Sequence, residues 1–173
     1  MINFIRILLI LFILNSHLYS DEADILFGKA WTLIQNNKYQ DAYKVFIEII
    51  KKNNDYGPAY RDAGWLLYDK LNKPKDSIQY LNKAEKLLPE DPLVYLYSGL
   101  AYSKLENYSE TIKYYQNAIF YYNKLQQPVP TGIYIGIGEL YMYKTNPHLH
   151  QKAIEMFLIG LKDDLDNTTK KML

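Results

Sequence analysis

Small residues recur along this chain at the spacing of a repeated helical hairpin. Ala30, Gly64, Gly99 and Gly138 lie 34, 35 and 39 residues apart, each in the middle of a segment with helical hydrophobic periodicity. A glycine inside a helix costs about 1 kcal/mol relative to alanine. Its return at one phase of the repeat therefore indicates that another helix crosses closely there.

A second helix is expected after each of these segments, and it carries a stripe of small and large residues. Positions i, i+4 and i+7 share one helix face, so the stripe predicts the seam along which the two helices of a hairpin pack. The seam residues are Ala42, Phe46 and Ile49; Ser77, Leu81 and Ala84; Thr111, Tyr115 and Ala118; and Ala153, Phe157 and Gly160.

Helix-breaking residues separate the expected helices. Asn36 and Asn37, Gly57 and Pro58, and several prolines fall between the periodic segments, and none interrupts one. The pattern predicts helices over residues 23–36, 39–52, 57–71, 75–87, 92–105, 108–124, 131–144 and 149–163.

The residue pattern resembles the tetratricopeptide repeat (TPR), in which aromatic and small residues alternate at set positions and a proline ends the hairpin. The third hairpin fits best, with Tyr95, Gly99, Tyr102, Tyr108, Thr111, Tyr115 and Ala118 in order. In the first hairpin Leu26 replaces the aromatic and Asn54 the proline, and the fourth has extra residues between its helices. The resemblance implies an all-α fold, a right-handed superhelical solenoid of antiparallel helix hairpins over residues 21–173.

The resemblance also implies a concave groove lined by the first helix of each hairpin. In the family, ligand contacts come from positions around the mid-helix small residue, and most of these are apolar or aromatic here. Carried over onto this sequence, the predicted groove residues are Phe27, Trp31, Ile34, Arg61, Trp65, Tyr68, Leu96, Leu100, Lys104, Ile135, Glu139 and Met142.

This groove predicts a protein or peptide partner. A clamp for a partner's C-terminal carboxylate needs Lys, Asn and Arg, whereas the corresponding places hold Phe27, Trp31, Asp62, Leu93 and Tyr97. An apolar or amphipathic segment is the expected ligand, with Trp31 and Trp65 as anchors, because large aromatics dominate interface energetics. The alternative is that both tryptophans only fill space between neighbouring helices.

The last expected helix suggests a second interface. Ile154, Leu158, Ile159 and Leu161 spread its apolar residues beyond one buried stripe. The alternative function is therefore a structural subunit of an envelope assembly complex, associating through this helix or with a second copy.

The N-terminus has the anatomy of an export signal. Residues 1–20 combine a short region ending at Arg6, an apolar run from Ile7 to Leu14 and a polar stretch to Ser20. The run is well below the about 20 residues that span a bilayer. We expect an exported protein, periplasmic or envelope-bound in a bacterium or secretory in a eukaryote, with an uncleaved membrane anchor as the alternative.

The amino-acid composition argues against several other classes of function. With 20 basic and 19 acidic residues, the chain has no overall field to attract nucleic acid. It has no cysteine, and His148 and His150 have no accompanying ligand cluster, so we expect no metal site. No catalytic constellation, cofactor motif or small-molecule site stands out, and the chain is not expected to be an enzyme.

Overall fold

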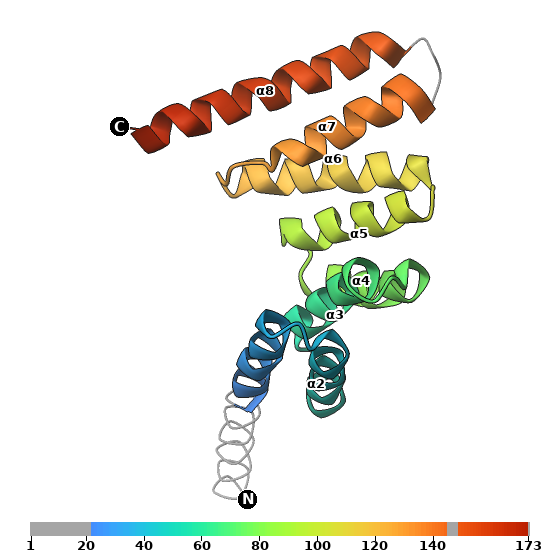
Figure 1. Ribbon diagram of the computed structural model, residues 1–173, viewed down its shortest axis with the longest axis vertical. Coiled ribbons are helices and arrows are strands. Elements are labelled where there is room, and N and C mark those ends of the chain that lie inside the picture. The colour runs from blue at the N-terminus through green and yellow to red at the C-terminus, as the bar shows by residue number, and fades with distance from the viewer. Residues whose placement is uncertain (1–21, 145–148, 173) are drawn as a thin grey trace, which may run out of the picture.

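The structure is all helical over its described residues. A computed structural model describes residues 22–144 and 149–172, and the side chains of residues 22–143 and 149–162 (Figure 1). The helices are 22–35, α2 (Tyr39–Lys52), α3 (Gly57–Asp69), α4 (Pro74–Leu87), α5 (Pro92–Lys104), α6 (Tyr108–Lys124), α7 (Thr131–Glu139), the π-helix η1 (Leu140–Lys144) and α8 (His150–Met172). The expected leader, residues 1–20, and Pro147 and His148 lie outside this description.

Consecutive helices pair into hairpins that stack along one axis, as the repeat predicts. We call the first helix of each hairpin the A-helix (22–35, α3, α5, α7) and the second the B-helix (α2, α4, α6, α8). The closest pairings are α3 with α4, α5 with α6 and α7 with α8. The helix direction turns steadily from the first hairpin to the last, which gives the stack the form of a superhelical solenoid (Figure 1).

Local sequence signals set where the helices begin and end. Prolines stand in the first turn of α3, α4 and α5, where a missing amide hydrogen costs nothing. Asp91 caps α5 by accepting a hydrogen bond from the Leu93 amide at 2.9 Å. Among the described residues, four turns contain a residue with positive φ, and asparagine, which tolerates this conformation, occupies two of them. These residues are Asn37, Asn72, Glu106 and Gln126.

The predicted seam is buried along the solenoid. Of its residues, Phe157 alone is half-buried, and all the others are buried. Each mid-helix glycine of an A-helix faces the large seam residue of its own B-helix. A Cβ at Gly64 would lie 2.6 Å from Leu81 Cγ, and one at Gly138 would lie 2.5 Å from Phe157 Cε1. Close helix crossing therefore explains the glycines, as the repeat spacing predicts.

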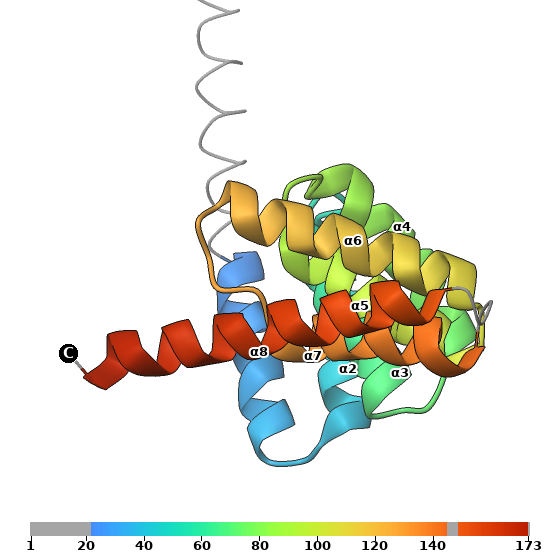
Figure 2. The same ribbon diagram turned by 90° about the horizontal axis from the view of Figure 1, so that it is seen from above.

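The fourth hairpin differs from expectation in two ways. The helix expected over 131–144 becomes a π-helix after Glu139. The last helix was expected to end near residue 163 but continues to Met172, so the boundary drawn there is wrong. Residues 161–172 contain neither glycine nor proline, so nothing stops the helix when its apolar pattern fades. Figure 2 shows α8 projecting beyond the helices stacked against it.

Candidate functional site

The two tryptophans stack on each other across neighbouring A-helices. Their ring centroids are 5.7 Å apart with an interplanar angle of 16°, and both side chains are half-buried. Tyr97 of α5 continues the row at 6.3 Å from Trp65, and Tyr68 lies 6.2 Å from Tyr97. We call Trp31, Trp65, Tyr97 and Tyr68 the aromatic row; it links three successive A-helices.

Other predicted groove residues of the first two hairpins lie largely in the core. Ile34 and Tyr68 are buried, and Phe27 packs between Phe46 and Tyr56, with both centroid distances 5.7 Å. Burial gives these side chains a structural role whatever the groove binds. The solvent-facing part of the row is therefore supplied by the half-buried Trp31, Trp65 and Tyr97.

Arg61 connects the second hairpin to the third. Its guanidinium donates to Asp62 at 2.6 Å and to Asp91, the cap of α5, at 2.7 Å, and its side chain is 18% exposed. Burial raises the pKa of the Asp62 carboxyl, and the adjacent Arg61 charge partly offsets this rise. Arg61 is thus held by two carboxylates at the junction between repeats.

The predicted groove residues of α5 are two leucines and one lysine, and they differ in their contacts. Leu96 and Leu100 are half-buried and pack against core clusters. Lys104 is exposed, but its ammonium donates to the carbonyl oxygen of Tyr68 at 2.8 Å and lies 5.8 Å from the Tyr68 ring centroid. The charge of Lys104 is therefore directed toward α3.

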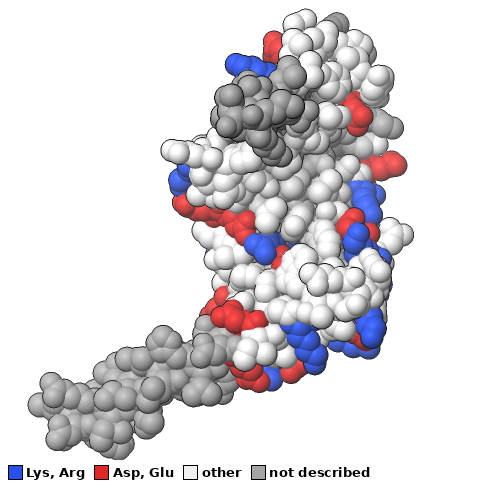
Figure 3. Space-filling view, turned by 60° about the vertical axis from the view of Figure 1, so that its left-hand side comes forward, with Lys and Arg blue, Asp and Glu red and all other residues white. Residues whose placement is uncertain are grey.

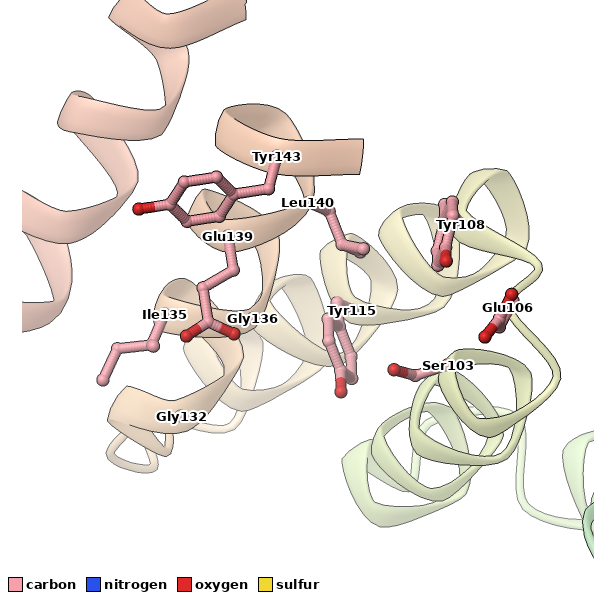
Figure 4. Close-up of a pocket in the computed structure, with 10 residues that line it drawn as sticks. All are labelled: Ser103, Glu106, Tyr108, Tyr115, Gly132, Ile135, Gly136, Glu139, Leu140 and Tyr143. Carbon is pink, nitrogen blue, oxygen red and sulfur yellow. The ribbon is translucent and has the colours of Figure 1, made fainter. Parts of the chain in front are cut away.

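The predicted residues of α7 and η1 are the most open. Ile135 is 43% exposed, Glu139 is exposed and Met142 is half-buried. Ile135 and Glu139 line a hollow of about 540 Å³ that opens between α5 and α7 (Figure 4). The other residues lining it are Ser103, Glu106, Tyr108, Tyr115, Gly132, Gly136, Leu140 and Tyr143.

Tyr115 of α6 forms the floor of this hollow. Its ring lies between two A-helix backbones, because a Cβ at Gly99 would collide with the ring and one at Gly136 would lie 2.9 Å from its Cε2. In Figure 4 the ring stands between Ser103 on one wall and Gly136 and Glu139 on the other. Burial, followed by the nearby Glu139 charge, raises the pKa of Tyr115 to about 12, so the phenol stays protonated at neutral pH.

Sequence reasoning assigned Tyr115 to the seam and did not consider Glu106. The repeat pattern identifies which residues share a hairpin, but the hollow depends on the separation of two hairpins. One signal was available: the large seam residue is a phenol in the third hairpin and an apolar side chain in the others. A buried phenol requires somewhere to place its hydroxyl.

Side chains on α8 leave an apolar stripe open. Ile154, Leu158 and Leu161 are 45%, 60% and 57% exposed, and their spacing places them along one side of the helix. Ala153 and Gly160, on the side that packs against α7, are buried. The helix therefore has a second apolar surface that its own hairpin does not cover.

Several site types are missing from the described part of the chain. It contains no group of three or more metal-ligating His, Asp or Glu side chains. His150 instead lies 3.2 Å, through Nε2, from the Met142 carbonyl oxygen. In the same residues no helix is long and apolar enough to cross a membrane. Lys, Arg, Asp and Glu are intermixed on the face seen in Figure 3.

Solved structures share this fold at low sequence identity. No protein-family model and no curated protein matches the chain. A MamA structure, residues 41 to the end, from Desulfovibrio magneticus RS-1 is similar with a TM-score of 0.71 at 22% identity, covering 83% of this chain and 76% of that one. YrrB, described as a TPR protein with an unusual peptide-binding site, has a TM-score of 0.66 at 19% identity, covering 87% and 75%.

A third similar structure is the Arabidopsis OM64 TPR domain. It has a TM-score of 0.64 at 17% identity and covers 72% of this chain and 98% of that one. With its helix pairs and the residues at their crossings, the chain has the tetratricopeptide-repeat fold that the sequence pattern predicts.

Proposed function

We propose that this protein is a non-catalytic interaction module that holds an apolar or amphipathic segment of another protein along its A-helices. The observation that carries the proposal is the aromatic row, whose tryptophans remain half-buried rather than enclosed. Rigid aromatic surface of this kind supplies most of the binding energy in protein interfaces. The peptide-binding site described for the similar YrrB gives the fold a precedent for such a role.

The proposed surface runs from the aromatic row toward the fourth hairpin. Leu96 and Leu100 extend it along α5, and Ile135 continues it on α7. An amphipathic helix or an extended segment with apolar residues on one side matches this succession. Export of the protein is proposed from residues 1–20 alone; N-terminal sequencing of protein from the native host tests it, and an intact Met1 in all the protein would overturn cleavage.

The binding proposal is tested by removing both anchors. Trp31→Ala combined with Trp65→Ala is expected to lower recovery of the native partner in a pull-down by about tenfold or more, since hot-spot tryptophans contribute about 2 kcal/mol or more each. Phe120→Ala is the matched control, because Phe120 is an aromatic of α6 that is 60% exposed and lies outside the predicted groove set. Circular dichroism verifies that each variant is folded. Unchanged recovery with the folded double variant would contradict the proposal.

The open stripe of α8 favours a second candidate function, self-association of this chain. Burying Ile154, Leu158 and Leu161 against the same residues of a second copy would remove three large apolar side chains of each copy from water. Leu158→Glu is expected to shift the protein to monomer in sedimentation velocity. Ile25→Glu, at a residue 74% exposed on helix 22–35, is the control. A wild-type protein that is monomeric at all accessible concentrations would remove this candidate.

A further inference from the structure

The hollow between α5 and α7 has an unbalanced set of charges. Among the described residues that line it, Glu106 and Glu139 are the only charged ones, and none is Lys, Arg or His. Within the described residues, neither carboxylate takes part in an ion pair. Lys104, next in sequence to the lining residue Ser103, is directed to the Tyr68 carbonyl instead. The hollow therefore has a negative potential that this part of the protein does not neutralise.

The floor of the hollow adds a polar group that has no hydrogen-bond partner among the described residues. The Tyr115 side chain is 95% buried, since only 5% of the residue is exposed, and its hydroxyl is directed into the hollow (Figure 4). No described residue forms a hydrogen bond with this hydroxyl, although other core tyrosines have partners, such as Tyr95 with the Pro89 carbonyl at 2.7 Å. A phenol hydroxyl that opens into the hollow and has no hydrogen-bond partner among the described residues is available to a ligand.

The position of this hydroxyl is fixed before any ligand arrives. The glycines at 99 and 136 let α5 and α7 approach both sides of the Tyr115 ring, which cannot move aside without displacing a backbone. Apolar walls flank the polar groups, with Leu140 buried on one side and Ile135 at the rim. A ligand with a long apolar stem and a charged end would match these walls and the two carboxylates.

We infer that the hollow receives a lysine or arginine side chain of the segment bound along the A-helices. The basic end would lie between the Glu106 and Glu139 carboxylates and donate a hydrogen bond to the Tyr115 hydroxyl. Its methylene stem would pack on Ile135 and Leu140. This inference rests on the proposed function and adds to it a required chemistry at one position of the partner.

Charge disfavours the opposite ligand. A carboxylate or phosphate in the hollow would face the like charges of Glu106 and Glu139, which is poor electrostatic complementarity. The groove therefore combines an apolar end at the aromatic row with an acidic end at the hollow. A bound segment should carry aromatic or aliphatic residues toward one end and a basic residue toward the other.

The experiment uses a displayed library of random peptides selected on the wild-type protein and on Glu106→Gln plus Glu139→Gln. Glu155→Gln, which removes an exposed carboxylate of α8 outside the hollow, is the matched control. Peptides selected on the wild type and on the control are expected to share a lysine or arginine at a fixed distance from their apolar anchors. The double glutamine variant should lose this preference while retaining the apolar one.

Affinity measurements then test whether the two carboxylates and the basic residue of the peptide interact with each other. A selected peptide should bind the double glutamine variant about five- to tenfold more weakly than it binds the wild type. Replacing the lysine of the peptide by norleucine should weaken its binding to the wild type by a similar factor. Combining the two changes should weaken binding little further, because both remove the same interaction. Tyr115→Phe should weaken the lysine peptide a few-fold and leave the norleucine peptide unaffected.

Two results would overturn the inference in distinguishable ways. If selected peptides depend on Trp31 and Trp65 but show no basic preference, or keep it with the double glutamine variant, the groove remains and the cation site fails. If the wild type selects no peptide at all, the groove and the cation site fail together.

Discussion

The first two hairpins and the last two build the same repeat geometry from different cores. The N-terminal cluster is aliphatic, with Ile34, Val45, Ile49 and Leu66 around Phe46, whereas the C-terminal cluster is built on tyrosines. The N-terminal A-helices meet through stacked rings, but α5 and α7 leave a hollow between them. Aliphatic side chains in a core only have to fill the available volume, whereas each buried phenol also needs a hydrogen-bond partner. The tyrosine core thus makes room for polar chemistry inside the groove.

The junction between the two halves should be the most sensitive point. Arg61→Ala is expected to lower the free energy of unfolding by about 3 kcal/mol, because it leaves the Asp62 carboxylate buried without its cation. Urea denaturation measures the loss. Lys124→Ala is the control, since its pair with Glu90 is exposed and should contribute less than about 1 kcal/mol. Equal losses in the two variants would mean that the junction has no special role.

The Arg61 variant should also change the pH dependence of stability. The pKa of Asp62 is raised in the folded protein, so its contribution is most favourable below the unfolded pKa of about 3.9 and declines as pH rises through the folded pKa. Without Arg61 the folded pKa should rise further. The difference in unfolding free energy between the variant and wild type should therefore grow from pH 4 to pH 7; a constant difference would contradict this assignment.

Two glycines test the contrast between crossing and open helix surfaces. Gly99→Ala should destabilise the protein by about 2 kcal/mol, because the added Cβ meets the confined Tyr115 ring. Gly28→Ala is the matched change: nothing lies within 4 Å of its Cβ, and better helix propensity should stabilise by about 0.5–1 kcal/mol. Thermal unfolding of both variants shows whether each substitution stabilises or destabilises the protein. Stabilisation by Gly99→Ala would show that the crossing can relax.

The smallest expected effects distinguish a tyrosine hydroxyl that has a hydrogen-bond partner from one that has no described partner. Tyr95→Phe removes a hydrogen bond to the Pro89 carbonyl and should cost about 1 kcal/mol. Tyr115→Phe removes a hydroxyl without a described partner and should change the unfolding free energy by less than about 0.5 kcal/mol. Denaturant unfolding of the two variants under one condition makes the comparison. A large loss from Tyr115→Phe would indicate that its hydroxyl is already bonded.

The sequence predicts the helices and their pairing because these follow from local patterns. Periodicity, the seam residues and the recurring glycines are all contained within one hairpin, and the described structure reproduces them. The stacking of Trp31 on Trp65 follows less directly, although both occupy the same repeat position. Their groove role remains a prediction.

The hollow at Tyr115 could not be predicted, since it depends on the spacing between hairpins. At 17 residues α6 is longer than α2 and α4, which have 14 each, and a connection over residues 125–130 follows it. The interval from Gly99 to Gly138 lengthens to 39 residues accordingly. Sequence spacing shows the insertion, but only the arrangement of α5, α6 and α7 shows where it opens space.

The confinement of the Tyr115 ring between two backbones makes it a reporter of motion. Because the backbones of α5 and α7 approach the ring closely at Gly99 and Gly136, we expect it to rotate by half a turn only when the two helices separate. Its flip rate, read from the exchange of ring proton signals in NMR spectra, therefore measures how often the third and fourth hairpins part. A partner segment bound across both hairpins should therefore lower the flip rate of the Tyr115 ring.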